Sequence, residues 1–284
     1  MSAPAARKTA FVLGGGGVLG ATQIGAMRAL LQRGITPDLV VGTSIGAING
    51  SFIAAEPSEE GIEALGELWA GLGSGRLLFD TGTSRGRRRW RPGRLRTHLY
   101  SPGPLLRILR QELPVQTFEE LQVPFQCVAA SVEHAVSHWF SSGKLPEAIV
   151  ASCAVPGLFP AMRIGGEHFF DGGLVHSIPV GRAVSLGATD VYVLQVGRVE
   201  QALSPPRWPW QVGQVTFEIA RRHRYLEEIA SVPDRVRLHV LPTGTSDAPM
   251  VSLLHINRAF VLGRVNSAYD AANAYLDEAE RRSS

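Results

Sequence analysis

The chain has 284 residues, 45% of them hydrophobic and 19% charged, which is the composition of an ordinary globular protein. Its length lies near the upper limit for one hydrophobic core, and without an apolar run of roughly 18–20 residues a membrane-spanning helix is excluded. The net charge of +3 has a local origin, because seven arginines fall between Arg85 and Arg96 and the remainder carries −4 (+3 minus 7).

The N-terminal part of the chain alternates between predicted strands and helices. Residues 9–13 are a short apolar run that predicts a buried strand ending in glycines. Apolar residues at helical spacing then predict a helix over 18–32. A second strand over 38–41 runs into Gly42-Thr43-Ser44-Ile45-Gly46, and small residues over 47–55 continue as a helix.

The rest of the chain continues this alternation around one irregular segment. Residues 59–72 predict a helix, whereas 73–103, rich in Gly, Pro and Arg, predict a basic surface insertion or cap. Further strands are expected over 125–130, 135–140, 190–196 and 235–241, and further helices over 105–113, 145–154, 179–186, 211–229 and 257–281. This order predicts an α/β fold, a three-layer sandwich with a largely parallel central sheet, in a single domain over 8–281.

The motif around Ser44 predicts a nucleophile. A serine hydroxyl must be presented clear of its own backbone, and a strained turn between strand and helix achieves this. Gly42 and Gly46 relieve the crowding at that turn, and the predicted strand before and helix after it are the expected context. The helix N-terminus also favours developing negative charge.

The glycine run near the N-terminus has two interpretations. Gly15, Gly17 and Gly20 match a dinucleotide-binding fingerprint, but that site also needs an acid at the end of the second strand, and Asp38 instead starts it. As an oxyanion hole the run is more coherent, because the N–H groups of Gly15, Gly16 and Gly17 are unshielded beside a helix N-terminus.

Asp171 is a candidate base for Ser44. It is followed by Gly172 and Gly173, and an Asp before glycines can also be a simple turn residue. A carboxylate near its usual pKa of about 4 is a weak base at neutral pH, so partial burial that raises the pKa is expected.

The three motifs together resemble those of the patatin-like phospholipases, of bacterial type: a G-G-G-x-[RK]-G loop, G-T-S-x-G and D-G-G. The stretch 151–160, which leads to Asp171-Gly172-Gly173, is similar to that family too. The resemblance implies a patatin-like fold and a serine acyl hydrolase of the lipase or phospholipase A type. It also implies a Ser44–Asp171 dyad, an oxyanion hole from Gly15, Gly16 and Gly17, lipid ester substrates, and no cofactor or metal.

Two positions depart from the family pattern. Leu19 replaces the basic residue of the glycine loop, which puts a side-chain role there in doubt but leaves the backbone donors intact. Ser177 stands in place of the family's Asn after D-G-G, which puts a local hydrogen bond in question.

Two other functions remain open. An α/β-hydrolase esterase with a Ser-Asp-His triad would draw its histidine from those that follow Asp171, namely His176, His223, His239 and His255. A lipid-binding or scaffold protein on the same fold is the second alternative, although such a protein would be expected to have lost Ser44, Asp171 or the glycines.

The basic segment suggests contact with a lipid surface. Arginines beside an aromatic side chain suit anionic headgroups, and the candidates are Arg87, Arg88, Arg89, Trp90 and Arg91. A solvated loop is the plain alternative, and nucleic acid is not expected as a partner, because one short cluster without a recognisable domain is weak support.

The cysteines and the N-terminus indicate the compartment. Cys127 and Cys153 lie in apolar surroundings without metal-binding spacing and are expected to be buried thiols. Residues 1–8 do not resemble a signal peptide. We therefore expect a cytoplasmic protein, in peripheral contact with membranes if the basic segment binds them.

Overall fold

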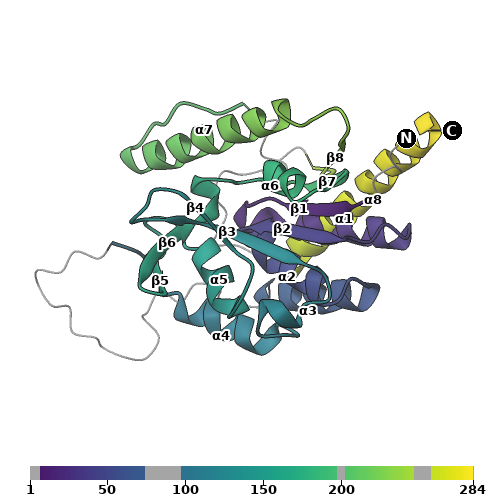
Figure 1. Ribbon diagram of the computed structural model, residues 1–284. Coiled ribbons are helices and arrows are strands. Elements are labelled where there is room, and N and C mark those ends of the chain that lie inside the picture. The colour runs from purple at the N-terminus through teal and green to yellow at the C-terminus, as the bar shows by residue number, and fades with distance from the viewer. Residues whose placement is uncertain (1–6, 74–96, 197–201, 246–256, 284) are drawn as a thin grey trace, which may run out of the picture.

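The computed structural model describes residues 7–73, 97–196, 202–245 and 257–283 and contains one mixed sheet of eight strands (Figure 1). The strand order is β5-β6-β3-β2-β1-β7-β8, with β4 paired to β3. The strands are β1 (Thr9–Leu13), β2 (Leu39–Thr43), β3 (Phe125–Ser131), β4 (Ser137–Phe140), β5 (Met162–Ile164), β6 (Glu167–Asp171), β7 (Asp190–Leu194) and β8 (Arg237–Leu241).

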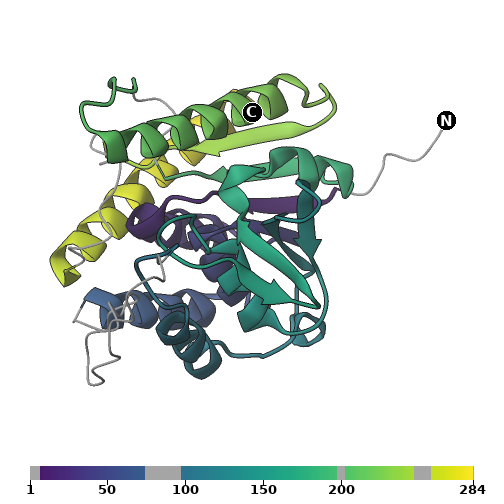
Figure 2. The same ribbon diagram turned by 90° about the vertical axis from the view of Figure 1, so that its left-hand side faces the viewer.

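Helices cover both faces of the sheet and make three layers. One face packs against α1 (Ala21–Gln32), α2 (Ile45–Ala55), α3 (Glu59–Gly73), α4 (Gly103–Glu112), α5 (Leu145–Ser152) and α8 (Arg258–Ser283). The other face packs against α6 (Val180–Ser185) and α7 (Pro209–Ala230). In the view of Figure 2, the green helix α7 lies along the top of the molecule and the blue helices α3 and α4 lie below the sheet.

The alternation of side chains along the central strands explains this layering. Phe11 and Leu13 of β1 point into the core under α1, α2 and α8, whereas Ala10 and Val12 point into the core under α6 and α7. Successive residues of a strand face opposite sides, so a strand that is apolar throughout needs cover on both. The prediction of a three-layer α/β sandwich is confirmed, with parallel pairing from β3 through β2, β1 and β7 to β8.

Strand β3 changes its partner at the point where the candidate site lies. Along one edge it pairs with β4. Along the other edge it pairs with β2 as far as Val128, which is opposite Thr43, and then with β6 from Ala129, which is opposite Asp171. The end of β2 and the end of β6 therefore meet beside adjacent residues of β3.

The other predicted elements agree with the structure within a few residues, with three differences. The first turn of the predicted helix over 18–32 is a 3-10 helix, η1 (Gly17–Gly20), and the strands β5 and β6 were not predicted. Two more 3-10 helices, η2 (Phe118–Glu120) and η3 (Gly172–Leu174), were not predicted either. Most of the predicted insertion 73–103 lies outside the described residues. In the described part of the chain, no helix has the length and apolar character to cross a membrane.

Candidate active site

Ser44 lies at a strained turn between β2 and α2. Its φ of 55° and ψ of −122° are unusual for a residue with a side chain, and such strain is typical of a nucleophile elbow. The flanking glycines are required by space, since a Cβ on Gly42 would lie 2.4 Å from the Gly46 oxygen. A Cβ on Gly46 would lie 2.2 Å from the Leu13 oxygen. The predicted elbow is therefore present, with the serine at its apex.

The elbow is held by a side chain that the sequence reasoning missed. The backbone N–H of Ser44 donates to the hydroxyl of Ser152, the last residue of α5, over 2.9 Å. Ser152 is fully buried. Helix α5 thus supports the strained residue directly.

Asp171 ends β6 and caps the short helix η3. One carboxyl oxygen, Oδ1, accepts the Gly173 N–H over 2.7 Å. The other, Oδ2, is buried and makes no hydrogen bond of ordinary geometry within the described residues, although the Ser44 hydroxyl is close enough to favour the ionised carboxylate. The structure thus brings Ser44 and Asp171 together, and Oδ2 is the carboxylate oxygen without a hydrogen bond of ordinary geometry among the described residues.

Burial dominates the electrostatics of this carboxylate. With 2% of the residue exposed, burial raises the pKa of Asp171 to about 6, against smaller lowering by the Ser44 hydroxyl, the Gly173 N–H and the Arg221 guanidinium. A base with this pKa is ionised at neutral pH and is a better proton acceptor than an exposed aspartate.

The two cysteines are buried, as predicted. Cys153 lies next to Ser44 and Asp171, where burial raises the pKa of its thiol well above the usual range and the Asp171 charge raises it further. Burial also raises the pKa of Cys127. Both thiols therefore stay protonated and are poor nucleophiles.

The glycine loop passes beside Ser44, as an oxyanion hole requires. A Cβ on Gly15 would lie 3.4 Å from the Ser44 Cβ. The Gly15 N–H, however, donates to the Ser177 carbonyl over 2.9 Å, which differs from the expectation that this group is free. The N–H groups of Gly16 and Gly17 make no such bond to another backbone carbonyl within the described residues, so they are the available donors.

A buried polar network lies under this loop. Gln23 donates to the carbonyls of Gly14 and Leu194 over 2.8 and 2.9 Å. Asn49 donates to the Gln23 side chain over 2.7 Å and accepts from Trp69 over 3.0 Å. An amide side chain in the largely apolar sequence of α2 is a signal that could have pointed to Asn49.

The loop is also in contact with α7, far away in the sequence. Arg221, which is 5% exposed, donates from Nη1 to the Gly15 carbonyl over 3.1 Å and to the Ser177 hydroxyl over 3.0 Å. Its Nε and Nη2 donate to Glu218 over 3.2 and 2.8 Å. Nothing in the local sequence around Arg221 indicates this role.

Three of the four histidines proposed for a triad lie in the described part of the chain, and each has a partner other than Ser44 or Asp171. His176 bonds to Glu228 over 2.6 Å, and exposed His223 lies 3.4 Å from Glu227 in the same helix. His239 stacks on Tyr192. No hydrogen bond links these three to Ser44 or Asp171 in the described part of the chain, and His255 lies outside it.

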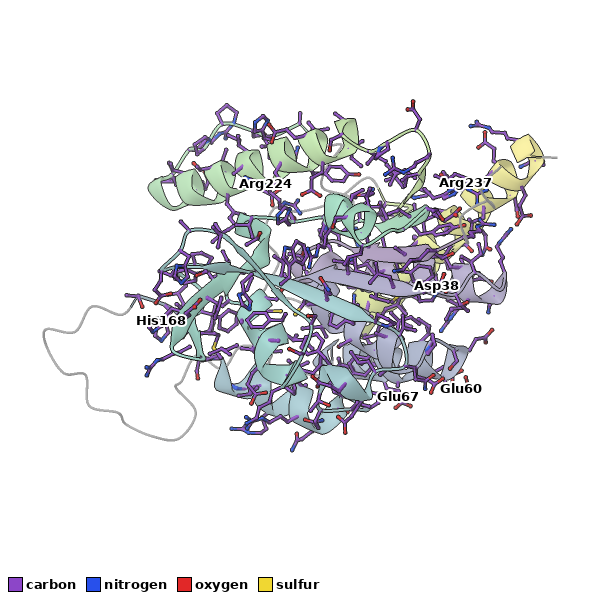
Figure 3. The ribbon with its side chains drawn as sticks, viewed as in Figure 1. Asp38, Glu60, Glu67, His168, Arg224 and Arg237 are labelled. Atoms are coloured by element: carbon purple, nitrogen blue, oxygen red, sulfur yellow. The ribbon has the colours of Figure 1, made fainter. Side chains whose placement is uncertain are left out.

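The site lies where the parallel strands end. Figure 3 labels Asp38 and Arg237, which lie at the other end of these strands, where β2 and β8 begin, and it labels Arg224 on α7. Ligand sites of open α/β sheets lie at the carboxyl ends of the strands. No group of three or more His, Cys, Asp or Glu that could hold a metal occurs within the described ranges. The basic candidates Arg87, Arg88, Arg89, Trp90 and Arg91 lie outside those ranges.

Residues 11–184, more than half of the chain, match the model of the family described as patatin-like phospholipase. The chain belongs to the patatin-like phospholipase family. It is 30% identical over 189 residues to lysophospholipase NTE1 of Mycosarcoma maydis, covering 66% of this chain and 10% of that protein. It is 28% identical over 192 residues to patatin-like phospholipase domain-containing protein 7 of Rattus norvegicus, covering 66% of this chain and 13% of that protein.

The fold has a neighbour among solved structures. VipD from Legionella pneumophila superposes with a TM-score of 0.57 and 17% identity, over 98% of this chain and 68% of that one. At this identity the likeness concerns the fold. The chain spans only about 10% to 13% of the length of the two relatives named above.

Proposed function

We propose that this protein is a serine acyl hydrolase that cleaves lipid carboxylic esters through Ser44 and Asp171, with residues 8–281 acting as one catalytic domain. One observation carries the proposal: Ser44 at a strained elbow lies close to a buried carboxylate whose Oδ2 has no hydrogen bond of ordinary geometry within the described residues. Unpaired buried polar atoms are rare because they are costly, and a catalytic role accounts for this one.

The reaction follows from these positions. Ser44 Oγ attacks the ester carbonyl while Asp171 Oδ2 accepts the hydroxyl proton, and the tetrahedral oxyanion is held by the N–H groups of Gly16 and Gly17. The oxyanion collapses, the alcohol leaves with that proton, and an acyl ester of Ser44 remains. Water then attacks this ester and gives a proton to the same carboxylate, and Asp171 passes that proton to Ser44 Oγ as the bond to the acyl group breaks and the acid leaves. Alignment of Ser44 with Oδ2 would tighten when substrate binds, as apo sites commonly do.

The substrate class rests on the family and on the printed names of the relatives. Both a lysophospholipase and phospholipase domain proteins match the chain, so an ester of a glycerophospholipid or lysophospholipid is the proposed substrate. The basic segment would hold the enzyme at an anionic lipid surface. The bacterial type of the family and the cytoplasmic location remain predictions from the sequence.

Single substitutions test the dyad. Ser44→Ala and Asp171→Asn should each lower ester hydrolysis by a factor of about a thousand or more, since the nucleophile and its base act as a unit. His176→Gln, His223→Gln, His239→Gln and His255→Gln should each keep most activity. Hydrolysis of lysophosphatidylcholine and of a short-chain nitrophenyl ester would be measured for all six variants.

Loss of activity in any one histidine variant that still folds would replace the dyad with a triad. A folded wild-type protein without hydrolysis on either substrate would favour the lipid-binding scaffold.

A further inference from the structure

The glycine loop has Leu19 where the family pattern has a basic residue, and the structure shows what this leucine contacts. Leu19 is fully buried and packs against Val196 and Phe260. These neighbours are apolar, so a charge held among them would be costly unless it were paired. The side chain at position 19 therefore serves the core.

A cation reaches the same loop from another element. We infer that Arg221 of α7 is the residue that positions the oxyanion loop. It binds the Gly15 carbonyl and the Ser177 hydroxyl through one nitrogen, Nη1. One of these contacts is with Ser177, a position at which the chain departs from the family pattern, and the other is with the glycine loop, which contains the second such position, Leu19.

The effect on the oxyanion donors follows from peptide geometry. A trans peptide holds its C=O and N–H in opposite directions, and the structure contains no cis peptide bond among its described residues. When Arg221 fixes the Gly15 carbonyl, it also fixes the direction of the Gly16 N–H in the same peptide unit. Consecutive glycines would otherwise let this peptide rotate at little cost. Arg221 is thus a positioning residue for one of the two available donors.

The charge of Arg221 also acts on the base. Its guanidinium lowers the pKa of Asp171, against the larger raising effect of burial. Glu218 holds the guanidinium through Oε2 and is itself buried, so the cation is fixed in place. Removal of the charge would move the pKa of Asp171 further up and reduce the ionised fraction of the base at neutral pH.

The test rests on the proposed function and uses the full chain with a soluble nitrophenyl ester, so that lipid binding plays no part. Arg221→Met should lower kcat by about tenfold or more with KM within about twofold, because a misdirected oxyanion donor affects the transition state. The acid limb of the pH profile should move to higher pH. Arg221→Lys should keep the acid limb at its wild-type pH and still lower kcat, since a lysine keeps the charge without the forked contacts. Arg224→Met, on the exposed side of α7, is the matched control and should leave both parameters unchanged.

A second variant distinguishes a folding defect from the loss of loop positioning. Arg221→Met takes one guanidinium away from the buried Glu218 carboxylate and leaves Arg222 Nε 3.7 Å from it, so Arg221→Met/Glu218→Gln removes the carboxylate charge as well. A folded double variant with wild-type kcat, or one in which only KM changes, would overturn the positioning role.

The loop can also be followed without catalysis. Backbone amide exchange over residues 14–17 should be faster in the double variant than in wild type and unchanged in Arg224→Met. Equal exchange in the double variant and wild type would overturn the inference even if the enzyme hydrolyses esters. A wild-type protein that hydrolyses nothing but shows the exchange difference would refute the proposed function and support the positioning role.

Discussion

At the scale of single residues, the buried carboxylate of Asp171 lowers the stability of the fold when it is ionised. Burial raises its pKa from 3.8 to about 6, and its Oδ2 lacks an ordinary hydrogen bond within the described residues. The unfolded chain releases the proton more readily than the folded one, so the native state is penalised as pH rises through this range.

Asp171→Asn should therefore stabilise the protein while it abolishes hydrolysis. A shift of about two pKa units corresponds to about 3 kcal/mol. The gain in free energy of unfolding should reach that order above about pH 7 and fade toward pH 4, where the aspartate is protonated in both states. Urea unfolding of the two proteins across this pH range measures it.

A second buried aspartate, Asp190, serves as a control, because its replacement by asparagine should change the stability in the opposite direction. Although burial alone raises the pKa of Asp190, hydrogen bonds from Arg237 and Arg7 outweigh it and leave the pKa below its usual value. The stabilisation by Asp190 is therefore present above the unfolded-state pKa and lost as pH falls through the folded-state pKa. Asp190→Asn should destabilise at neutral pH. Destabilisation by Asp171→Asn at pH 7 would contradict the account of the buried base.

Some residues of the candidate site could be predicted from the sequence and others could not. Ser44 and Asp171 could be predicted because each lies in a short motif whose neighbours are required by geometry. Arg221 could not, because its contact with Gly15 joins residues 206 positions apart and depends on how α7 packs. Ser152 lay inside a stretch that resembles the family, but its bond to Ser44 spans 108 positions and is set by the fold.

At the scale of elements, the elbow depends on support from α5. Ser44 has a strained backbone, and strained residues persist only when the surrounding structure over-determines them. The single hydrogen bond from Ser44 N–H to Ser152 Oγ is part of that support.

Ser152→Ala should leave the Ser44 N–H without its buried acceptor. The expected result is a loss of about 1–3 kcal/mol in the free energy of unfolding and a fall in kcat, since the nucleophile is less well held. Chemical unfolding and steady-state kinetics on a soluble ester measure both. The control is Ser51→Ala, because the Ser51 hydroxyl is equally buried but donates within its own helix to Ile48. Equal effects of the two substitutions on kcat would remove Ser152 from the site.

Elements also differ in how far the sequence predicts them. Apolar runs and helical spacing predicted the parallel strands and their helices, since these patterns follow from burial on two faces. The hairpin of β5 and β6 was missed, although Gly165 and Gly166 both have positive φ and a Gly-Gly pair favours a tight hairpin turn. Strand β6 pairs with the same edge of β3 as β2, starting at the residue after the last one that β2 pairs with. This pairing joins segments far apart in the sequence, so no local sequence pattern predicts it.

At the scale of the whole molecule, charge is unevenly distributed. The segment from Arg85 to Arg96 carries seven arginines and the remainder a net charge of −4. Contact with an anionic surface through this segment would leave the acidic body facing solution. Each basic residue near such a surface contributes about 1 kcal/mol.

The protein should bind vesicles that contain phosphatidylserine and not vesicles of phosphatidylcholine alone, with binding that weakens as salt rises. Replacing Arg87, Arg88, Arg89 and Arg91 by glutamine should abolish most of this binding and leave hydrolysis of a soluble ester unchanged. Vesicle sedimentation at low and high salt measures the effect. Equal binding to both vesicle types would remove the basic segment as the membrane contact.

The central claim is that Ser44 is a nucleophile activated by Asp171 without a histidine. Reaction with a fluorophosphonate, followed by peptide mass spectrometry, tests it most directly, because the reagent labels activated serines. The account predicts one label on Ser44, retained in the His176→Gln, His223→Gln, His239→Gln and His255→Gln variants and lost in Asp171→Asn. A folded protein whose Ser44 stays unlabelled, or is labelled equally well without Asp171, would contradict it.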